Sequence, residues 1–439
     1  MAPPRRARAR ANLHLLLALL LPYFCCLPLP RRAAAQPAPA GDASLLLEIK
    51  RAWGDPSVLA GWNATAAGAL CGWPFVTCDA AGRVANLTLA NTNVTGPFPD
   101  AVGDLSSLAH LDVSNNNIAG AFPAALFRCR SLQYLNLSQN YFGGVLPTDI
   151  GGGLASSLTT LDLFGNMFNG TIPASLSGLR NLQYLSLGSN RFSGTVPEEL
   201  GELTNLQVLY LANNWFDEGK LPASFKNLTN LVSLWASGCN FVGDFPNFVW
   251  RFNKLQELNL YKNNLTGEMV VDGFEARSLT VIDVSENMIN GVIPELFGSL
   301  ENLDTLNLFM NNFSGEIPAS IGRLQSLTML RIYTNMLNGT LPPELGKNSP
   351  GLYYIEADFN ELTGAIPEGL CAGGQLELFT AKYNLLNGSI PAGLASCSSL
   401  HTLILEGNQL SGELPVGLWT ATRLAYLNLR DNQFTGSPF

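Results

Sequence analysis

Residues 303–318 read Leu-Asp-Thr-Leu-Asn-Leu-Phe-Met-Asn-Asn-Phe-Ser-Gly-Glu-Ile-Pro, and this pattern decides the fold. It recurs at residues 108–123 and 400–415, and the shared template is L-x-x-L-x-L-x-x-N-x-L-x-G-x-[IFVL]-P. Self-similarity at a fixed period of about 20 to 50 residues indicates a solenoid or another repeat architecture.

The asparagine of the template marks 15 successive repeats. The interval is 24 residues in 11 of the 14 steps, and the other steps are 25, 25 and 26 residues. Thirteen positions hold asparagine, one holds Thr92 and one holds Cys239. A period this regular predicts one elongated domain for the 439 residues, where length alone suggests several compact ones. The marked positions are 92, 116, 140, 166, 190, 214, 239, 263, 287, 311, 335, 360, 384, 408 and 432.

Each part of the template has a mechanical role. In L-x-L the leucines point to one face of a short strand and the intervening residues to the other, so stacked repeats give an α/β solenoid with one long parallel sheet. The asparagine amide can bond backbone groups of neighbouring turns at both ends, and Cys239 suits this position as a compact weak donor. The glycine allows a tight turn and the proline fixes φ. The proline is missing at Val270 and stands one position early at Pro438, which predicts irregularity in the eighth turn and at the end of the stack.

The composition excludes several classes of protein. With 42 glycines and 26 prolines the chain cannot form a coiled coil or a helical bundle, and 47% hydrophobic residues supply enough burial to exclude disorder. The excess of 34 acidic over 25 basic residues opposes nucleic-acid binding. Three histidines leave a thin inventory for catalysis or for a metal, and we expect neither a metal site nor a cofactor.

Residues 1–35 predict a secretory signal peptide. Four arginines within residues 5–10 precede an apolar stretch over residues 15–29, and three alanines follow at 33–35. A signal anchor is less favoured because three prolines interrupt a stretch already short for a bilayer. Cleavage removes six arginines and no acid, which changes the formal net charge from −9 to −15 and leaves six cysteines in a compartment that permits disulfides.

The G-x-[IL]-P extension and the 24-residue period resemble the plant-specific class of leucine-rich repeat proteins. The resemblance spans about residues 42–439 and implies a curved, twisted superhelix with the parallel sheet on its concave face. We therefore expect a signal peptide at 1–35, an N-terminal cap at 36–82 and about 15 repeats at 83–439, with no C-terminal cap.

The cap combines a helix and a cysteine pair. Residues 45–53 predict an amphipathic helix, which would cover the first hydrophobic layer of the solenoid. The following Cys71-Gly-Trp-Pro-Phe75-Val-Thr-Cys78 resembles the plant-family cap C-x-W-x-G-V-x-C, in which the cysteines are bonded. The resemblance implies a Cys71–Cys78 disulfide, and Phe75 departs from the pattern where glycine is usual.

The other cysteines fall into two groups. Cys371 and Cys397 lie 26 residues apart, one repeat plus two, on the convex flank of adjacent turns. With turns about 4.8 Å apart a disulfide is sterically reasonable, and two buried thiols are the alternative. Cys129 and Cys239 lie far apart in the stack, and we expect them to be inert core residues.

The last repeat stops at Phe439 without a closing cysteine pair, an apolar span or another cap. An open edge of this kind is physically unsatisfactory. We interpret the chain as a fragment, a truncated gene model or a splice form of a longer protein.

The chain contains ten N-x-[ST] sequons. The template N-x-L-[ST]-G itself generates some of them, yet the secretory route predicts that several are glycosylated. Asn136 lies between Leu135 and Leu137, so a glycan there would block the concave face at the third turn. The sequons are Asn63, Asn86, Asn93, Asn136, Asn169, Asn227, Asn264, Asn312, Asn338 and Asn387.

No motif in the sequence supports catalysis. His110 and His401 are about twelve turns apart, and no nucleophile, base and acid share a plausible spacing. Phosphate-loop and kinase motifs are absent, and the run at residues 151–153 is interpreted as slack in the 26-residue interval.

The outward positions of the strands are the candidate binding site. The early turns carry small polar residues, and from the sixth turn aromatic and charged residues replace them. Exposed rings beside isolated charges suggest a binding groove, although lateral packing between rings explains part of the pattern. Eight turns span about 34 Å, which suits an extended peptide of ~10 to 12 residues better than a small glycan. The candidate residues are Tyr210, Trp235, Tyr261, Phe309, Arg331, Tyr333, Tyr354, Glu356, Asp358, Phe359, Lys382 and Tyr383.

Three stretches, residues 45–62, 133–140 and 370–376 followed by 397–400, resemble the ectodomains of HAESA-like plant receptor kinases. The resemblance implies a plasma-membrane or secreted extracellular location, a secreted peptide as ligand and a shorter leucine-rich repeat co-receptor kinase as partner. Membrane attachment and the Ser/Thr kinase domain would lie in a part that this chain lacks. Many members hold the peptide's terminal carboxylate with an R-x-R pair, but Thr402 and Ile404 occupy those positions here, which indicates a divergent branch.

Two other functions remain open from the sequence. A secreted leucine-rich repeat inhibitor of a cell-wall hydrolase is the main alternative, although it predicts a complete C-terminal cap and fewer repeats. A purely structural wall protein would not require the change to aromatic residues after the fifth turn.

Overall fold

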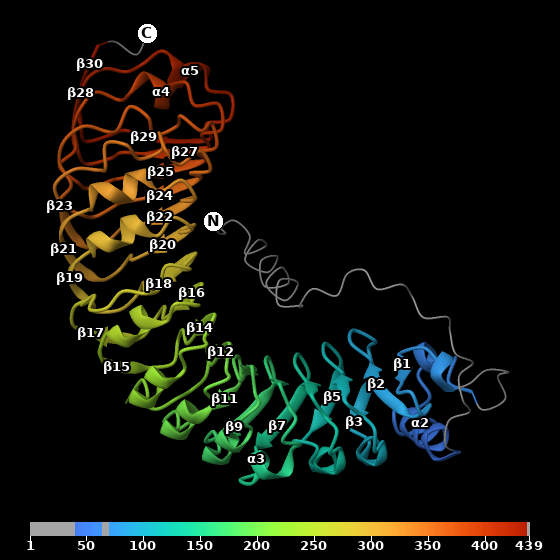
Figure 1. The fold of residues 1–439 in the computed structure, drawn as a ribbon. Helices are drawn as coiled ribbons and strands as arrows, with labels where there is room; N and C mark the ends of the chain where they lie inside the picture. The colour runs from blue at the N-terminus through green and yellow to red at the C-terminus, as the bar shows by residue number, and fades with distance from the viewer. Residues whose placement is uncertain (1–39, 64–69, 437–439) are drawn as a thin grey trace.

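The computed structural model describes residues 40–63 and 70–436, and these residues form one curved solenoid (Figure 1). The predicted signal peptide lies outside the described residues. In the described part of the chain, no helix has the length and apolar character needed to cross a membrane.

Within the described residues, one sheet of 16 strands runs the whole length of the solenoid. Its first pair is antiparallel and every later pair is parallel, as the stacked repeats predict. The strands are β1 Val76–Cys78, β2 Val84–Thr88, β4 His110–Asp112, β6 Tyr134–Asn136, β8 Thr160–Asp162, β10 Tyr184–Ser186, β12 Val208–Tyr210, β14 Ser233–Trp235, β16 Glu257–Asn259, β18 Val281–Asp283, β20 Thr305–Asn307, β22 Met329–Arg331, β24 Tyr354–Glu356, β25 Leu378–Thr380, β27 Thr402–Ile404 and β29 Tyr426–Asn428.

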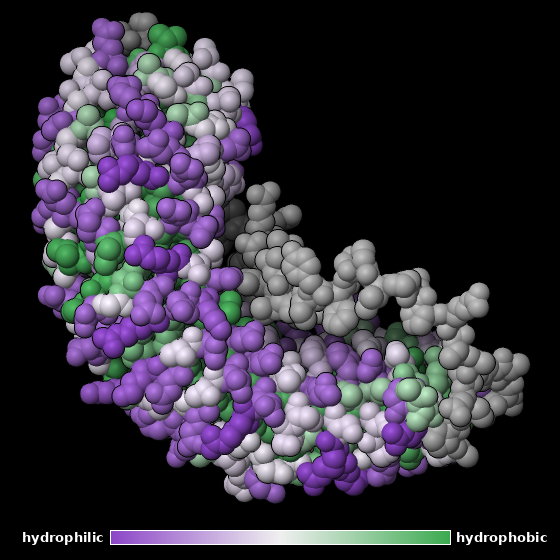
Figure 2. Space-filling view, in the orientation of Figure 1, coloured by the Kyte–Doolittle hydropathy of each residue, from purple (hydrophilic) through white to green (hydrophobic). Residues whose placement is uncertain are grey.

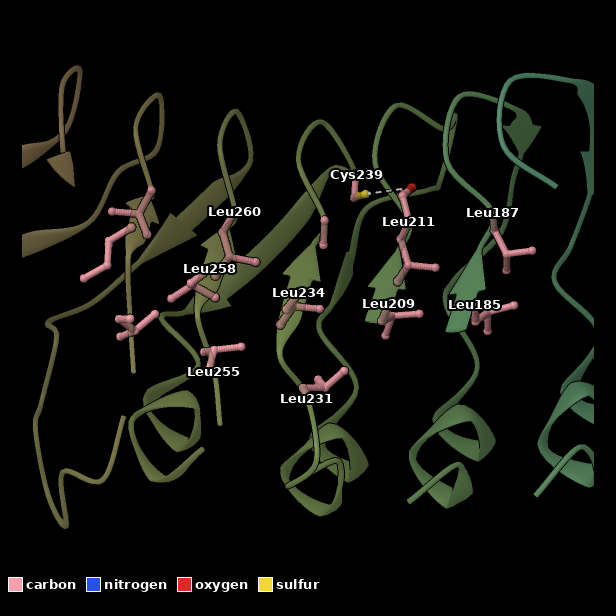
Figure 3. Close-up of a cluster of buried hydrophobic side chains, with 14 of the residues drawn as sticks. Leu185, Leu187, Leu209, Leu211, Leu231, Leu234, Cys239, Leu255, Leu258 and Leu260 are labelled. Atoms are coloured by element: carbon pink, nitrogen blue, oxygen red, sulfur yellow. Dashed lines mark hydrogen bonds between the residues drawn. The ribbon is translucent and has the colours of Figure 1, made fainter. Parts of the chain in front are cut away.

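The register of the sheet stacks leucine on leucine. Leu185 pairs with Leu209, and Leu234 pairs with Leu258, each in the middle of its strand. These side chains point into the solenoid and are fully buried (Figure 3). Because alternate residues of a strand face opposite sides, the residues on either side of each central leucine form the concave surface.

Shorter strands form four separate outer ladders in the described residues. They follow the marked position of most repeats, where the chain leaves the main sheet. The ladders contain β3 Thr95–Pro97, β5 Asn117–Gly120, β7 Tyr141–Val145, β9 Met167–Gly170 and β11 Arg191–Phe192; β13 Gly219–Lys220, β15 Phe241–Asp244 and β17 Asn264–Thr266; β19 Asn290–Val292, β21 Asn312–Glu316 and β23 Met336–Asn338; and β26 Asn387–Gly388, β28 Gln409–Glu413 and β30 Gln433–Thr435.

Short helices form most of the convex side of the repeats, and the longest described helix belongs to the cap. In most repeats the helix begins directly after the template proline, whose fixed φ suits a helix start. The helices are α2 Ala40–Ala52, α3 Ile150–Gly153, α4 Ala392–Ala395 and α5 Gly417–Thr420, with the 3₁₀ helices η1 Ser57–Leu59, η2 Leu70–Gly72, η3 Asp100–Asp104, η4 Ala124–Arg128, η5 Ala174–Gly178, η6 Glu198–Glu202, η7 Ala223–Asn227, η8 Asn247–Arg251, η9 Glu295–Ser299 and η10 Ala319–Arg323.

The predicted asparagine ladder is confirmed. In the fifth repeat the Asn190 amide nitrogen donates to the carbonyls of Leu163 and Leu187 at 2.9 and 3.1 Å. Its oxygen accepts the backbone N–H of Phe168 at 3.1 Å. Each buried amide therefore links its own turn to the preceding one and satisfies backbone groups that no strand pairs.

Cys239 takes part in the ladder as the sequence predicts. Its thiol donates to the carbonyl oxygen of Leu211 at 3.4 Å (Figure 3) and to that of Ser237 at 3.5 Å. The thiol does not replace the acceptor oxygen of an asparagine. In the preceding repeat the Asn214 side-chain oxygen accepts the Phe192 N–H at 3.0 Å. The N–H that an asparagine at position 239 would accept belongs to the buried Phe216.

Cys239→Asn is therefore expected to stabilise the solenoid by about 1 kcal/mol, because it supplies a neutral acceptor to a buried N–H. Urea unfolding of the variant and the parent chain measures the difference. A variant less stable than the parent would show that the smaller thiol is required by packing.

The eighth turn is irregular, as the missing proline predicts. Residues 271–278, which follow Val270, contain no helix, and they connect β17 to the next turn. Two of the outer ladders are separated at this turn, where one isolated bridge joins Glu268 to Asn290.

The N-terminal cap contains the predicted helix and disulfide. Cys71 and Cys78 are bonded, with their Cα atoms 5.4 Å apart. Phe75 has φ of +66°, the left-handed conformation that glycine adopts most easily, which explains why the plant pattern has glycine here. A buried carboxylate oxygen of Asp42 in α2 accepts the Val84 N–H at 2.7 Å and ties the cap to the first parallel strand.

The remaining cysteines also match the prediction. Cys371 and Cys397 form a disulfide with a Cα separation of 5.9 Å. Cys129 and Cys239 are free and buried. Burial raises the pKa of Cys129 to about 11 and raises that of Cys239 further, so both thiols stay protonated and inert at neutral pH.

The interpretation of residues 151–153 as slack is wrong. They form most of α3, and a Cβ on Gly151 would lie 1.6 Å from the carbonyl oxygen of Ser175. A Cβ on Gly153 would lie 2.6 Å from the ring of Phe127. Close packing against a backbone carbonyl of the next turn therefore requires glycine at position 151, whereas a side chain at position 153 would require the Phe127 ring to move.

Candidate ligand-binding surface

The twelve candidate residues lie on or directly after strands β12, β14, β16, β20, β22, β24 and β25 of the main sheet. They occupy outward positions, so the sheet brings them together into one strip, the concave strip. Two of them differ from the expectation of exposed rings. Tyr210 and Phe309 are buried, with 8% and 5% of their surface accessible.

Neighbouring rings explain this burial. Tyr210 packs edge-on against Trp235, with ring centroids 5.4 Å apart, and Tyr184 of β10 packs on its other side at 5.9 Å. Lateral packing, the alternative noted from the sequence, accounts for Tyr210 and for part of Trp235. At this end the strip presents ring edges rather than open faces.

Arg331 is the centre of the next part of the strip. Its guanidinium lies over the ring of Phe309 at 4.5 Å and over Tyr333 at 5.6 Å, and these two rings stack on each other at 4.5 Å. The same guanidinium forms an ion pair with Glu356 of the next strand. Stacking and pairing together fix the charge, so this arginine is preorganised for a partner.

The most exposed part of the strip follows β24 and β25. Phe359 and Tyr383 stack at 5.1 Å, are 46% and 44% exposed, and have positive φ angles of 55° and 53°. The Lys382 ammonium lies over the ring of Phe359 at 5.1 Å, and the Lys382 backbone N–H donates to the Asp358 carboxylate at 2.8 Å. The positive φ recurs at this position of the template, for example in Gln139, Met310 and Thr334, so it belongs to the repeat geometry. What sets Phe359 and Tyr383 apart is two exposed rings side by side, which points to a role in recognition.

Hydrogen bonds and ring contacts hold the other tyrosines of the strip. The Tyr261 hydroxyl donates to Glu286 at 2.9 Å, and the Tyr383 hydroxyl donates to Glu406 at 2.7 Å. Tyr354 packs edge-on against Tyr353, with ring centroids 4.3 Å apart. These contacts leave the rings rigid, and a rigid ring loses little entropy on binding.

Sequence reasoning missed an acid in the early turns. Asp162 of β8 lies on the concave surface among tyrosines, and its carboxylate accepts the Phe164 N–H at 3.0 Å. Burial raises the pKa of Asp162 to about 6. The available sequence signal was Tyr134 and Tyr184, which occupy the outward positions of the strands on either side.

Asp162→Asn is expected to stabilise the protein by about 2 kcal/mol at neutral pH and to have almost no effect near pH 4. Folding raises the pKa of Asp162, so protonation of this acid favours the folded state. The free energy of unfolding therefore falls as pH rises through about 6. Urea unfolding at the two pH values measures this, and an equal effect at both would contradict it.

Comparison with known proteins agrees with this geometry. Residues 82–142 and 156–216 match the family "Leucine rich repeat", residues 39–79 match "Leucine rich repeat N-terminal domain", and four later segments match "Leucine Rich Repeat". The Arabidopsis receptor kinase HAESA, solved with the peptide hormone IDA and the co-receptor SERK1, is 35% identical, with a TM-score of 0.81 over 90% of this chain and 70% of that chain. The chain is a plant leucine-rich repeat receptor ectodomain.

Other relatives of the ectodomain are similar over shorter parts. The plant peptide hormone receptor RGFR1, solved with RGF2, is 34% identical, with a TM-score of 0.72 over 84% of this chain and 65% of that chain. A polygalacturonase inhibitor from Pyrus communis is 44% identical over 68 residues, which are 15% of the ectodomain. The ectodomain spans about a fifth of the length of this curated relative.

Most sequons of the ectodomain are accessible. Asn63, Asn93, Asn169, Asn227, Asn264, Asn312, Asn338 and Asn387 are exposed, whereas Asn86 and Asn136 are half-buried on the concave strands β2 and β6. The Asn136 side chain is held locally, since its oxygen accepts the Ser138 N–H at 2.9 Å. A glycan at either concave position would stand in front of the early turns.

A second surface feature of the ectodomain lies away from the concave strip. A cavity of about 440 Å³ lies on the convex side, lined in part by Val292, Glu295 and Pro318. Figure 2 shows a hydrophobic patch at this level, near β19 and β21, where Val292 is 61% exposed. Among the described residues, no three His, Cys, Asp or Glu side chains are placed to hold a metal ion.

Proposed function

We propose that the ectodomain senses a secreted peptide at the cell surface, as a HAESA-like receptor acting with a shorter leucine-rich repeat co-receptor kinase. The observation that carries the proposal is the pair of open, stacked rings of Phe359 and Tyr383 beside Lys382. Similarity to peptide-hormone receptors over most of the chain supports it. A receptor ectodomain acts on the extracellular side of the plasma membrane.

The concave strip suits an extended peptide. Rings supply contact area at low entropic cost, and the fixed charges of Arg331 and Glu356 set the register of a ligand. The strand β27 carries Thr402 and Ile404 where many HAESA-like receptors have the arginine pair. We therefore expect the ligand to be held without a clamp on its terminal carboxylate.

The test is binding of synthetic peptides of about 12 residues to the secreted chain. Tyr333→Ala, Phe359→Ala and Tyr383→Ala are each expected to weaken a bound peptide about tenfold or more, because each removes a ring from the strip. Tyr141→Ala is the matched control, since Tyr141 is an exposed tyrosine on the outer strand β7. Unchanged affinity in all three variants would place the site elsewhere.

Inhibition of a cell-wall hydrolase is the second candidate, favoured by the local match to polygalacturonase inhibitors. Its support covers a small part of the chain, so we rank it below peptide sensing. Loss of polygalacturonase activity on adding the ectodomain, together with no peptide binding, would reverse this order.

A further inference from the structure

Two acids and an amide form a group of hydrogen-bond acceptors at the ninth and tenth turns. Asp283 ends β18, and its register partner in β20 is Asn307. The Asn307 amide nitrogen donates to Asp283 Oδ2 at 3.0 Å, and Ser285 N–H donates to Asp283 Oδ1 at 3.2 Å. Three residues along from Asp283, Glu286 accepts the Tyr261 hydroxyl at 2.9 Å.

The amide oxygen of Asn307 has no donor among the described residues. Asn307 is 7% exposed, and this oxygen is buried without a hydrogen bond. Its orientation is fixed, because turning the amide would place oxygen against the Asp283 carboxylate. A buried acceptor without a hydrogen bond is destabilising, so a donor supplied by a ligand would stabilise this group.

No basic side chain of the described part of the chain neutralises these acids. Neither Asp283 nor Glu286 belongs to an ion pair. Arg331 lies on the strand next to Asn307, but it is paired with Glu356 and stacked on Phe309. The acids therefore retain uncompensated negative charge beside an arginine that is already occupied.

Two aromatic rings lie beside this group. The rings of Tyr261 and Phe309 have centroids 6.3 Å apart, and they belong to the turns just before and just after the one that carries Asp283 and Glu286. Carboxylates, an amide oxygen and aromatic rings together are the surroundings that a guanidinium prefers, since it offers five donors and a plane that stacks. A metal ion is disfavoured because the described residues contain no cluster of three metal-binding side chains.

We infer that Asp283, Glu286 and Asn307 form a subsite of the concave strip that binds a guanidinium side chain of the ligand. The inference rests on the proposed peptide-sensing function and adds that the peptide carries an arginine. That arginine would contact the strip beside the fixed Arg331–Glu356 pair, so its position along the peptide is set by the turn spacing.

The test compares Nα-acetyl-arginine amide with Nα-acetyl-citrulline amide as probes, using ligand-observed NMR on the whole secreted chain. Citrulline has nearly the same shape but no charge. We expect the arginine probe to bind at least tenfold more tightly, and Asp283→Asn and Glu286→Gln each to remove most of this preference. Asp244→Asn, an exposed acid on the outer strand β15, is the matched control and is expected to keep it.

Each outcome decides between the two ideas. Equal binding of the two probes to the parent chain overturns the subsite, whatever the variants do. Arginine-selective binding that Asp283→Asn and Glu286→Gln leave intact also overturns it, because the probe then binds elsewhere. If selected peptides bind the strip with the same affinity in both variants, the proposed function stands and the subsite fails. If only the arginine probe binds, selectively and at these acids, the subsite stands without the proposed function.

Discussion

Gly151→Ala is expected to destabilise the ectodomain by at least about 3 kcal/mol. The new methyl group would lie 1.6 Å from the Ser175 carbonyl oxygen, a backbone atom of the next turn that cannot rotate away. The two turns would have to separate, which breaks the stacking on which a solenoid depends. Urea unfolding followed by circular dichroism measures the loss.

Gly152→Ala is the matched control in the same helix. A Cβ on Gly152 meets nothing within 4 Å, and alanine favours helix by about 1 kcal/mol over glycine. The control should therefore be neutral or slightly stabilising. If both variants lose the same stability, the cause is the glycine-rich helix itself and the contact with Ser175 is irrelevant.

Asn263→Ala is expected to cost about 3 to 4 kcal/mol. The Asn263 amide nitrogen donates to the carbonyls of Ala236 and Leu260, both at 2.9 Å, and its oxygen accepts the N–H of Cys239 at 3.1 Å and of Phe241 at 3.0 Å. Alanine would leave these backbone groups buried and without partners.

Hydrogen exchange distinguishes a local from a global effect of this substitution. Amides of the seventh and eighth turns should exchange faster, while those of the cap should change little, because each repeat contacts only its neighbours. Asn253→Ala serves as control, because Asn253 is an exposed asparagine ten residues before Asn263 and outside the ladder. Uniform loss of protection along the whole chain would contradict nearest-neighbour stacking.

The sequence predicted the solenoid because the same buried contacts repeat at a regular interval along the chain. Every buried leucine and every ladder asparagine has the same surroundings as its counterpart 24 residues away, so one repeat explains the next. The Cys371–Cys397 disulfide was predictable for the same reason, since repeat spacing places these two cysteines on adjacent turns, whereas the Cys71–Cys78 disulfide was implied by the resemblance of the cap to the plant family.

The details of the candidate site depend on contacts that the template does not encode. Tyr210 and Phe309 occupy outward positions, yet neighbouring rings and the Arg331 guanidinium cover them. Gly151 looks like slack in the sequence because the Ser175 carbonyl that forbids a side chain belongs to the next turn. In the same way, the raised pKa of Asp162 arises from burial that its neighbours create.

The inner and outer edges of the solenoid differ as mechanical elements. The inner sheet is continuous through the described residues, whereas the outer strands form four ladders with three gaps between them. Backbone hydrogen bonds still cross these gaps, as from the Trp215 N–H to the Phe192 carbonyl at 2.9 Å and from the Met288 N–H to the Leu265 carbonyl at 2.8 Å, so adjacent turns are joined at both edges. The continuous inner sheet fixes the spacing between adjacent turns along the concave edge. A ligand lying along that edge therefore meets contact positions at a constant interval, one for each turn.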